Sequence, residues 1–225
     1  MPDAVVTLAA GPRVPPPLAL YAHIPWCVRK CPYCDFNSHP ARGDIPEAAY
    51  LDALRRDLES ALPEVWGRPV VSVFIGGGTP SLLSAAGLDR LLSDIRGLLN
   101  LTPGAEITLE ANPGTFEAAR FADYRAAGVT RLSLGVQSFN DQALAAIGRI
   151  HGGTEARAAA EQARGLFDRL NLDLMYGLPG QDLAGLCADI EMVLACAPDH
   201  LSAYHLTLEP NTAFAAAPPP LPDDD

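Results

Sequence analysis

Residues 18–34 read LALYAHIPWCVRKCPYC, a short apolar run that leads into three cysteines within eight residues. The apolar run predicts a buried β-strand over 18–24. Pro25 and Pro32 predict that the cysteines lie in a loop, because proline cannot continue a regular strand or helix. A strand whose carboxyl end runs into a cysteine-rich loop indicates a site for a metal or for redox chemistry.

The remainder of the sequence repeats the pattern of apolar run followed by amphipathic segment. Further strands are predicted over 70–75, 106–111, 131–136, 171–176 and 200–207. Helices are predicted from an N-cap at Asp44-Ile-Pro-Glu47 through Leu62, and over 88–99, 116–127, 141–167 with a break at Gly152-Gly153, and 183–197. Gly128 is expected to close the third of these helices.

Alternation of strand and helix is typical of an α/β protein with a parallel sheet. The apolar strands predict that both faces of the sheet are covered. Periodicity leaves open whether the sheet is an open doubly wound one or a closed or partial barrel.

Composition restricts the class of protein and its partners. The chain has 225 residues and a formal net charge of −11, which argues against nucleic acid or an anionic membrane surface as the main partner. No apolar run is long enough for a transmembrane helix, and the N-terminus lacks the pattern of a signal peptide. We therefore expect a cytoplasmic protein whose cysteines serve metal or redox chemistry and not disulfides. Cys187 and Cys196 lie among apolar helix residues and are predicted to be buried core residues.

The two ends differ from the middle of the chain. Residues 1–17 are proline-rich and predict an irregular lead-in, residues 18–209 form the predicted core domain, and residues 210–225 are rich in Pro, Ala and Asp. The last segment is typical of a linker, an exposed tail or a truncated end. We expect that a second, C-terminal domain has been cut off or was never present.

Unusual polar residues follow the predicted strands at their carboxyl ends, the rim at which parallel α/β proteins bind ligands. Thiolates are the ligands of iron–sulfur clusters, and three of them leave one iron of a four-iron cluster open. The competing interpretations are a zinc site completed by His23 or His39 and a chance group of buried cysteines. Glu110 and Asp173 are predicted in buried strands, so each needs a cationic or hydroxyl-rich partner. The alternative for both is a structural ion pair with Arg131 or Arg149.

The motifs, taken in order, resemble those of the radical S-adenosylmethionine (SAM) superfamily. Within it the chain is similar to the oxygen-independent coproporphyrinogen III oxidase family, over about residues 18–222. The resemblance rests on YAHIPWC at 21–27, the Cys27-x3-Cys31-x2-Cys34 spacing, GGGTP at 76–80, EANP at 110–113, GVQSF at 135–139, GRIH at 148–151 and DLMYGLPG at 173–180.

The resemblance implies a parallel six-stranded partial (β/α) barrel that lacks the family's C-terminal accessory domain. It implies that Cys27, Cys31 and Cys34 hold a [4Fe–4S] cluster whose open iron binds SAM. The residues that match the family's SAM contacts are Tyr21, Tyr33, Gly77, Gly78, Thr79, Glu110, Gln137, Arg149 and Asp173.

Two branches of this family differ in function. The dehydrogenase branch, which decarboxylates propionates to vinyl groups, carries an extra cysteine two residues after the third ligand, where this chain has Phe36. The sequences CPYCDF at 31–36 and LTLEPNTAF at 206–214 are similar to the HemW heme-chaperone branch. That branch implies heme as cargo, apo-hemoproteins as clients, an electron donor such as a flavodoxin or ferredoxin, and membrane association only through clients. Two further hypotheses for the chain are a zinc-stabilised α/β binding module and a truncated, non-functional paralogue.

Overall fold

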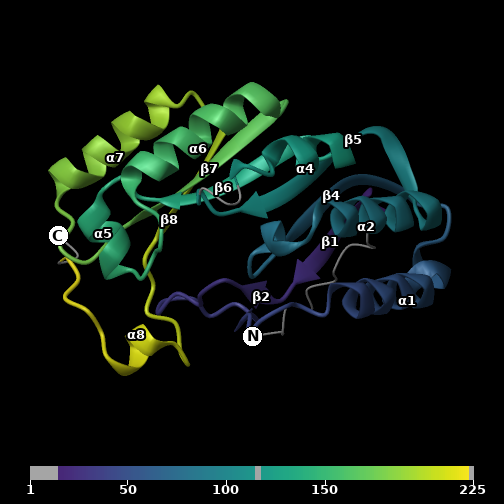
Figure 1. Ribbon diagram of the computed structural model, residues 1–225, viewed down its shortest axis with the longest axis horizontal. Helices are drawn as coiled ribbons and strands as arrows, with labels where there is room; N and C mark the ends of the chain where they lie inside the picture. Colours follow the sequence, from purple (N-terminus) through teal and green to yellow (C-terminus); the bar gives the residue numbers. More distant parts are fainter. Residues whose placement is uncertain (1–14, 115–117, 223–225) are drawn as a thin grey trace, which may run out of the picture.

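Six parallel strands form one curved sheet in the computed structural model, which describes residues 15–114 and 118–222 (Figure 1). The strand order is β1-β4-β5-β6-β7-β8, and every neighbouring pair is parallel. The strands are β1 (Leu18–Ile24), β4 (Pro69–Gly77), β5 (Asn100–Ala111), β6 (Arg131–Gln137), β7 (Arg169–Tyr176) and β8 (His200–His205). Each strand lies beside the next one along the chain, so the order never reverses as it does in a doubly wound sheet. The fold is the partial (β/α) barrel that the resemblance implied.

Helices follow the strands, and α1 packs on α2, α2 on α4 and α4 on α6. They are α1 (Glu47–Val65), α2 (Ala85–Leu98), α4 (Phe121–Ala127), α5 (Asp141–Ala146), α6 (Gly153–Leu166), α7 (Leu183–Ala195) and α8 (Ala213–Ala216), with a 3₁₀ turn η1 at Pro80–Leu82. In the described part of the chain, no helix is long and apolar enough to cross a membrane. Most of the predicted lead-in (residues 1–14) and the predicted start of the helix at Phe116 lie outside the described residues.

The helices cover one face of the sheet, so the prediction that both faces are covered is wrong. In β7, Leu170 and Leu172 are fully buried on the helical side. On the other side Asn171 donates a hydrogen bond to Asp173, and both contact Ser133 of β6. This second face carries polar side chains, because it faces a cavity and not a second layer of helices.

The first helix does not begin as its sequence predicts. Its N-cap position is Pro46, which makes no side-chain capping bond, so the predicted cap at Asp44 is wrong. The Glu47 carboxylate accepts hydrogen bonds from the backbone N–H and the hydroxyl of Ser84, both at 2.6 Å. It thereby joins α1 to the start of α2. By contrast, Gly128 closes α4 in the left-handed conformation, with φ 110°, as predicted.

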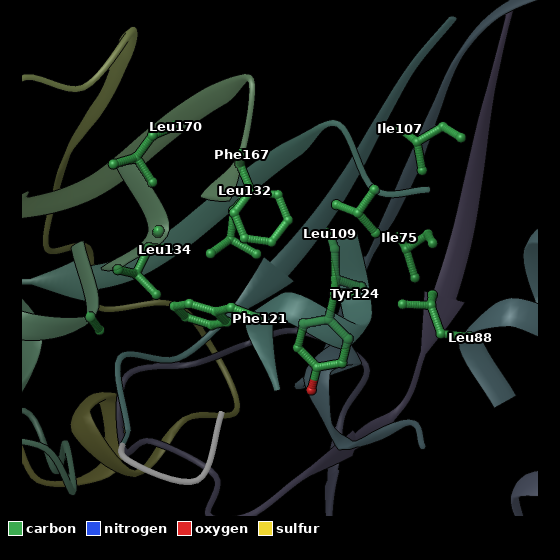
Figure 2. Close-up of a cluster of buried hydrophobic side chains, with 14 of the residues drawn as sticks. Ile75, Leu88, Ile107, Leu109, Phe121, Tyr124, Leu132, Leu134, Phe167 and Leu170 are labelled. Atoms are coloured by element: carbon green, nitrogen blue, oxygen red, sulfur yellow. The ribbon is translucent and has the colours of Figure 1, made fainter. Parts of the chain in front are cut away.

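Aromatic residues of α4 fill the space between the helices and the sheet (Figure 2). Phe121 is fully buried and meets Phe167 edge-on, with ring centroids 6.0 Å apart.

We predict that Phe121→Ala lowers the free energy of unfolding by about 3–5 kcal/mol, because the cavity it leaves cannot fully collapse. Leu194→Ala is the control: Leu194 is 67% exposed, so its replacement should change stability by less than about 0.5 kcal/mol. Equal losses in denaturant unfolding of the two variants would contradict this assignment of the core.

Candidate functional site

The cysteine loop is closed by two short strands, β2 (Trp26–Cys27) and β3 (His39–Pro40), which pair in parallel. The backbone N–H of Ala41 donates to the carbonyl of Cys27 at 2.8 Å. Within the loop, the Lys30 ammonium donates to the carbonyls of Phe36 at 2.9 Å and Ser38 at 3.1 Å. These bonds fix the loop that carries all three cysteines beyond the carboxyl end of β1.

The glycine loop after β4 packs directly against the cysteine loop. The backbone N–H of Gly78 donates to Ile24 at 2.7 Å, and that of Thr79 donates to Trp26 at 2.6 Å. A Cβ atom on Gly78 would lie 2.5 Å from the carbonyl oxygen of Trp26 and 3.0 Å from the Sγ of Cys27. Only glycine therefore allows the two backbones to approach this closely.

A cavity of about 440 Å³ opens at the carboxyl ends of the strands. All but one of the site residues predicted from the sequence line this cavity. Those that line it are Cys27, Cys31, Tyr33, Cys34, Gly77, Gly78, Thr79, Glu110, Gln137, Arg149 and Asp173. Tyr21 is the exception, because it does not line this cavity. Tyr21 is 55% exposed, and its ring stacks on Phe74 with centroids 6.1 Å apart.

Two largely buried carboxylates face this cavity, and neither forms an ion pair with a cation of the described residues. Glu110 accepts a hydrogen bond from the backbone N–H of Gly77 at 3.0 Å. The hypothesis of an ion pair with Arg131 is wrong, because Arg131 binds Glu106 at 3.2 Å. Burial raises the pKa of Glu110 to about 7, with a further contribution from the charge of Asp173, while the Gly77 N–H opposes the shift. Burial also raises the pKa of Asp173, against the hydrogen bond from Asn171.

The raised pKa of Glu110 predicts a pH dependence of stability. Between the ordinary value of 4.5 and about 7, the folded state holds a proton that the unfolded chain has lost, so Glu110 makes stability fall as pH rises. Glu110→Gln should remove this effect, leaving the variant more stable than the wild type at pH 8 and similar to it at pH 4. The quantity to compare is the difference in unfolding free energy between the variant and the wild type, because a second group also titrates in this range. Burial lowers the pKa of His151 to about 4, so His151 makes the stability of both proteins rise with pH. Denaturant unfolding of both proteins at both pH values measures the difference, and a difference independent of pH would contradict the assignment.

Arg149 lies between the cysteine loop and the ends of β5 and β6. Its Nη2 donates to the side-chain oxygen of Asn112 at 2.7 Å and to the carbonyl of Gly135 at 2.6 Å. Its Nη1 donates to the Sγ of Cys31 at 3.9 Å. The buried Nε has no hydrogen-bond partner among the described residues. The hypothesis in which Arg149 pairs with Glu110 is therefore wrong.

Some residues of the site were not selected from the sequence. Tyr204 of β8 donates a hydrogen bond to Gln137, which has a left-handed backbone with φ 70°. Asp189 of α7 is buried and accepts from the Ser138 hydroxyl and the Phe139 N–H, both at 2.7 Å, so it holds the turn that follows Gln137. The α7 sequence carries two acids, Asp189 and Glu191, and nothing in it distinguishes the buried one.

The remaining two cysteines differ in their surroundings. Cys196 is buried, as predicted, but Cys187 is exposed, so the prediction that it belongs to the core is wrong. Cys187 lies on the side of α7 that faces away from the sheet, the side that also carries the exposed Leu183 and Leu194.

The three cysteines of the loop fit an iron–sulfur cluster better than a single zinc ion. Among the described residues, no three His, Cys, Asp or Glu side chains converge as a single-ion site requires. Each thiolate of a cluster binds a different iron, so its ligands need not meet at one point. Both ring nitrogens of His23 have other partners, the Tyr21 hydroxyl at 2.9 Å and the Asn37 carbonyl at 2.8 Å. The Arg149 guanidinium lies beside Cys31 and forms no ion pair among the described residues, so it would favour an anionic cluster there.

Comparison with known proteins agrees with this geometry. The family model described as "Radical SAM superfamily" matches residues 21–193, most of the described sheet and its helices. The chain belongs to the radical SAM superfamily. The motifs that resembled this superfamily in the sequence are those that line the cavity.

Individual radical SAM relatives are similar over nearly the whole chain. The protein named heme chaperone HemW of Escherichia coli K12 is 55% identical over 93% of this chain and 56% of its own length. The HemW of Haemophilus influenzae is 52% identical over 93% of this chain and 56% of its own. The solved structure of coproporphyrinogen III oxidase (HemN) from E. coli has a TM-score of 0.83 and 34% identity over 92% of this chain and 49% of that one. The chain thus spans about half the length of the relatives it matches.

Proposed function

We propose that this chain is the radical SAM core of a heme chaperone, which binds a [4Fe–4S] cluster, SAM and heme and delivers heme to apo-hemoproteins. The observation that carries the proposal is the 55% identity, over 93% of this chain, to a protein named heme chaperone HemW. The proposal includes a cytoplasmic location, hemoprotein clients and a one-electron donor such as a flavodoxin or ferredoxin.

The site supports the cofactors of this proposal through the chemistry of its donors. Cys27, Cys31 and Cys34 would hold the cluster, which supplies an electron to SAM when both are bound. Glu110 and Asp173 are largely buried carboxylates that form no ion pair among the described residues, and they would accept hydrogen bonds from the ammonium and hydroxyl groups of SAM. Tyr33 and Gln137 also line the cavity and would contact the remainder of the cofactor.

A second candidate function is oxidative decarboxylation of coproporphyrinogen III. The structural likeness to the oxidase HemN, with a TM-score of 0.83, favours it. The side chain of Phe36 opposes it. The resemblance places a cysteine of the dehydrogenase branch at this position. Here the position is Phe36, which is 56% exposed and lines the cavity with an apolar side chain.

Heme transfer tests the proposal. The chain with its cluster rebuilt anaerobically is loaded with heme, separated from free heme and mixed with an apo-hemoprotein, and the absorption of the client is followed. We expect the heme spectrum to move to the client faster than from heme-loaded serum albumin, used as a passive heme carrier. A chain that binds no heme, or that releases it no faster than albumin, would contradict the proposal.

Turnover distinguishes the two candidates in the same preparation. With reductant, SAM and coproporphyrinogen III supplied anaerobically, we expect no decarboxylated tetrapyrrole by mass spectrometry. Formation of protoporphyrinogen together with 5′-deoxyadenosine would establish the oxidase and overturn the chaperone.

A further inference from the structure

Arg149 is a buried cation without an anionic partner among the residues that the structure describes. It takes part in none of the ion pairs of the described chain, and its buried Nε has no acceptor. The two acceptors of its Nη2, Asn112 and Gly135, are neutral. His151, two residues on, is also neutral at pH 7, because burial lowers its pKa to about 4. Burial raises the pKa of Asp173 and the charge of Arg149 lowers it, but the side chains of Arg149 and Asp173 form no ion pair. A buried guanidinium without an ion pair is unfavourable, so a further anion beside Arg149 would stabilise it.

The position of Arg149 beside Cys31 is fixed from two directions. The preceding Gly148 has φ 74°, and a Cβ atom there would lie 2.7 Å from the ring of Pro32. The backbone N–H of Arg149 donates to the carbonyl of Leu144 at 2.9 Å. The side chain is held by Asn112 and Gly135, so its Nη1 stays at 3.9 Å from the Sγ of Cys31.

A four-iron cluster would change the charge beside this guanidinium in two steps. A core of charge 2+ bound by three thiolates carries one net negative charge. One-electron reduction makes or breaks no bond to the protein and adds a second negative charge. A fixed positive charge in a region of low dielectric therefore stabilises the reduced cluster more than the oxidised one. Hydrogen bonds to the ligand sulfur act in the same direction.

We propose that Arg149 sets the reduction potential of the cluster, raising it through its charge and its hydrogen bond to the sulfur of Cys31. This inference rests on the proposed [4Fe–4S] cluster and goes beyond a contact with SAM, because it operates when SAM is absent. Arg149 would thus make the cluster easier to reduce, before SAM is bound as well as after.

Potentiometric titration of the reconstituted holoprotein without SAM, followed by the EPR signal of the reduced cluster, tests this inference. Arg149→Gln removes the charge, and we expect a lower midpoint potential than in the wild type. Arg149→Lys keeps the charge, and its potential should lie between the two.

A second variant tests the charge without removing the arginine. In Asn112→Asp the new carboxylate can keep the hydrogen bond to Nη2, but it pairs the guanidinium and cancels its charge. Its partner Thr79, which accepts from Asn112 at 3.2 Å, can donate to the carboxylate instead. We expect Asn112→Asp to lower the potential as Arg149→Gln does, and it serves as the deciding variant if Arg149→Gln does not retain a cluster.

The matched control is Arg29→Gln, which removes an exposed positive charge from the cysteine loop. Solvent screens Arg29, so its loss should shift the potential less. Equal potentials in the wild type, Arg149→Gln and Asn112→Asp, or an equal shift in Arg29→Gln, would overturn this inference alone. A wild type that assembles no cluster by iron and sulfide analysis would overturn the proposed function, which separates the two failures.

Discussion

Replacing Cys31 with serine is expected to abolish the cluster. The iron and sulfide content of the anaerobically reconstituted protein should fall from about four of each per chain to near zero, because a serine hydroxyl is not an adequate ligand for the iron. The half-buried Cys31 lies in a loop and contributes little to the core, so Cys31→Ser should still unfold cooperatively. Metal and sulfide analysis, together with the visible absorption, measures the effect.

Cys187→Ser is the matched control for this prediction. It also removes one thiol, but from the exposed face of α7 and outside the cavity. We expect its iron content to equal that of the wild type. A full cluster in Cys31→Ser, or an equal loss in Cys187→Ser, would contradict the assignment of ligands.

Gly78→Ala is expected to have the second large effect, on both the cluster and SAM. The added Cβ would lie 2.5 Å from the carbonyl oxygen of Trp26 and 2.8 Å from its carbonyl carbon, and backbone atoms cannot move aside as the end of a side chain can. The two loops must therefore separate, which displaces Cys27. We expect at least a tenfold loss of SAM affinity, or about 1.4 kcal/mol, measured by calorimetry on the reconstituted protein.

Gly97→Ala provides the comparison, because a Cβ there meets nothing within 4 Å. Gly97 lies near the end of α2, where alanine should stabilise the helix by up to about 1 kcal/mol. The variant should bind SAM as the wild type does. Wild-type affinity in Gly78→Ala would show that the close approach of the two loops is not needed for the site.

The fold could be predicted from the sequence where the signal is local. The apolar runs at 18–24 and 131–136 each became a strand of the sheet within one residue of the predicted ends. Gly128 ended its helix because a glycine adopts φ 110° without strain. The cysteine spacing and the polar residues after each strand were sufficient to predict a site at one rim, since the carboxyl ends of parallel strands meet there.

The predictions that proved wrong depend on residues far apart in the chain. Glu47 was expected to cap its own helix, but it binds Ser84, 37 residues away. An ion pair with Arg131 was one expectation for Glu110, but Arg131 is bound to Glu106 of the neighbouring strand. A pattern within one segment cannot show which partner another segment has already taken.

Contacts between distant segments also explain why helices cover only one face of the sheet, although both faces were expected to be covered. Alternation in Arg169-Leu-Asn-Leu-Asp173 is visible in the sequence, but leucines dominate the strand and suggested burial on both sides. In the structure Asn171 is buried and donates hydrogen bonds to Ser133 and Asp173, so a hydrogen-bonded polar face without helices on it replaced the expected apolar, helix-covered one.

Binding of SAM to the reduced cluster is the most direct test of the central claim, that this cavity holds a cluster with one open iron and SAM beside it. The measurement is the EPR spectrum of the reconstituted, reduced chain before and after addition of SAM. The account predicts a [4Fe–4S] signal that changes shape on addition of SAM, with Glu110→Gln needing a higher concentration of SAM for the same change. A spectrum that SAM leaves unaltered, or a reconstituted protein with zinc and no iron, would contradict it.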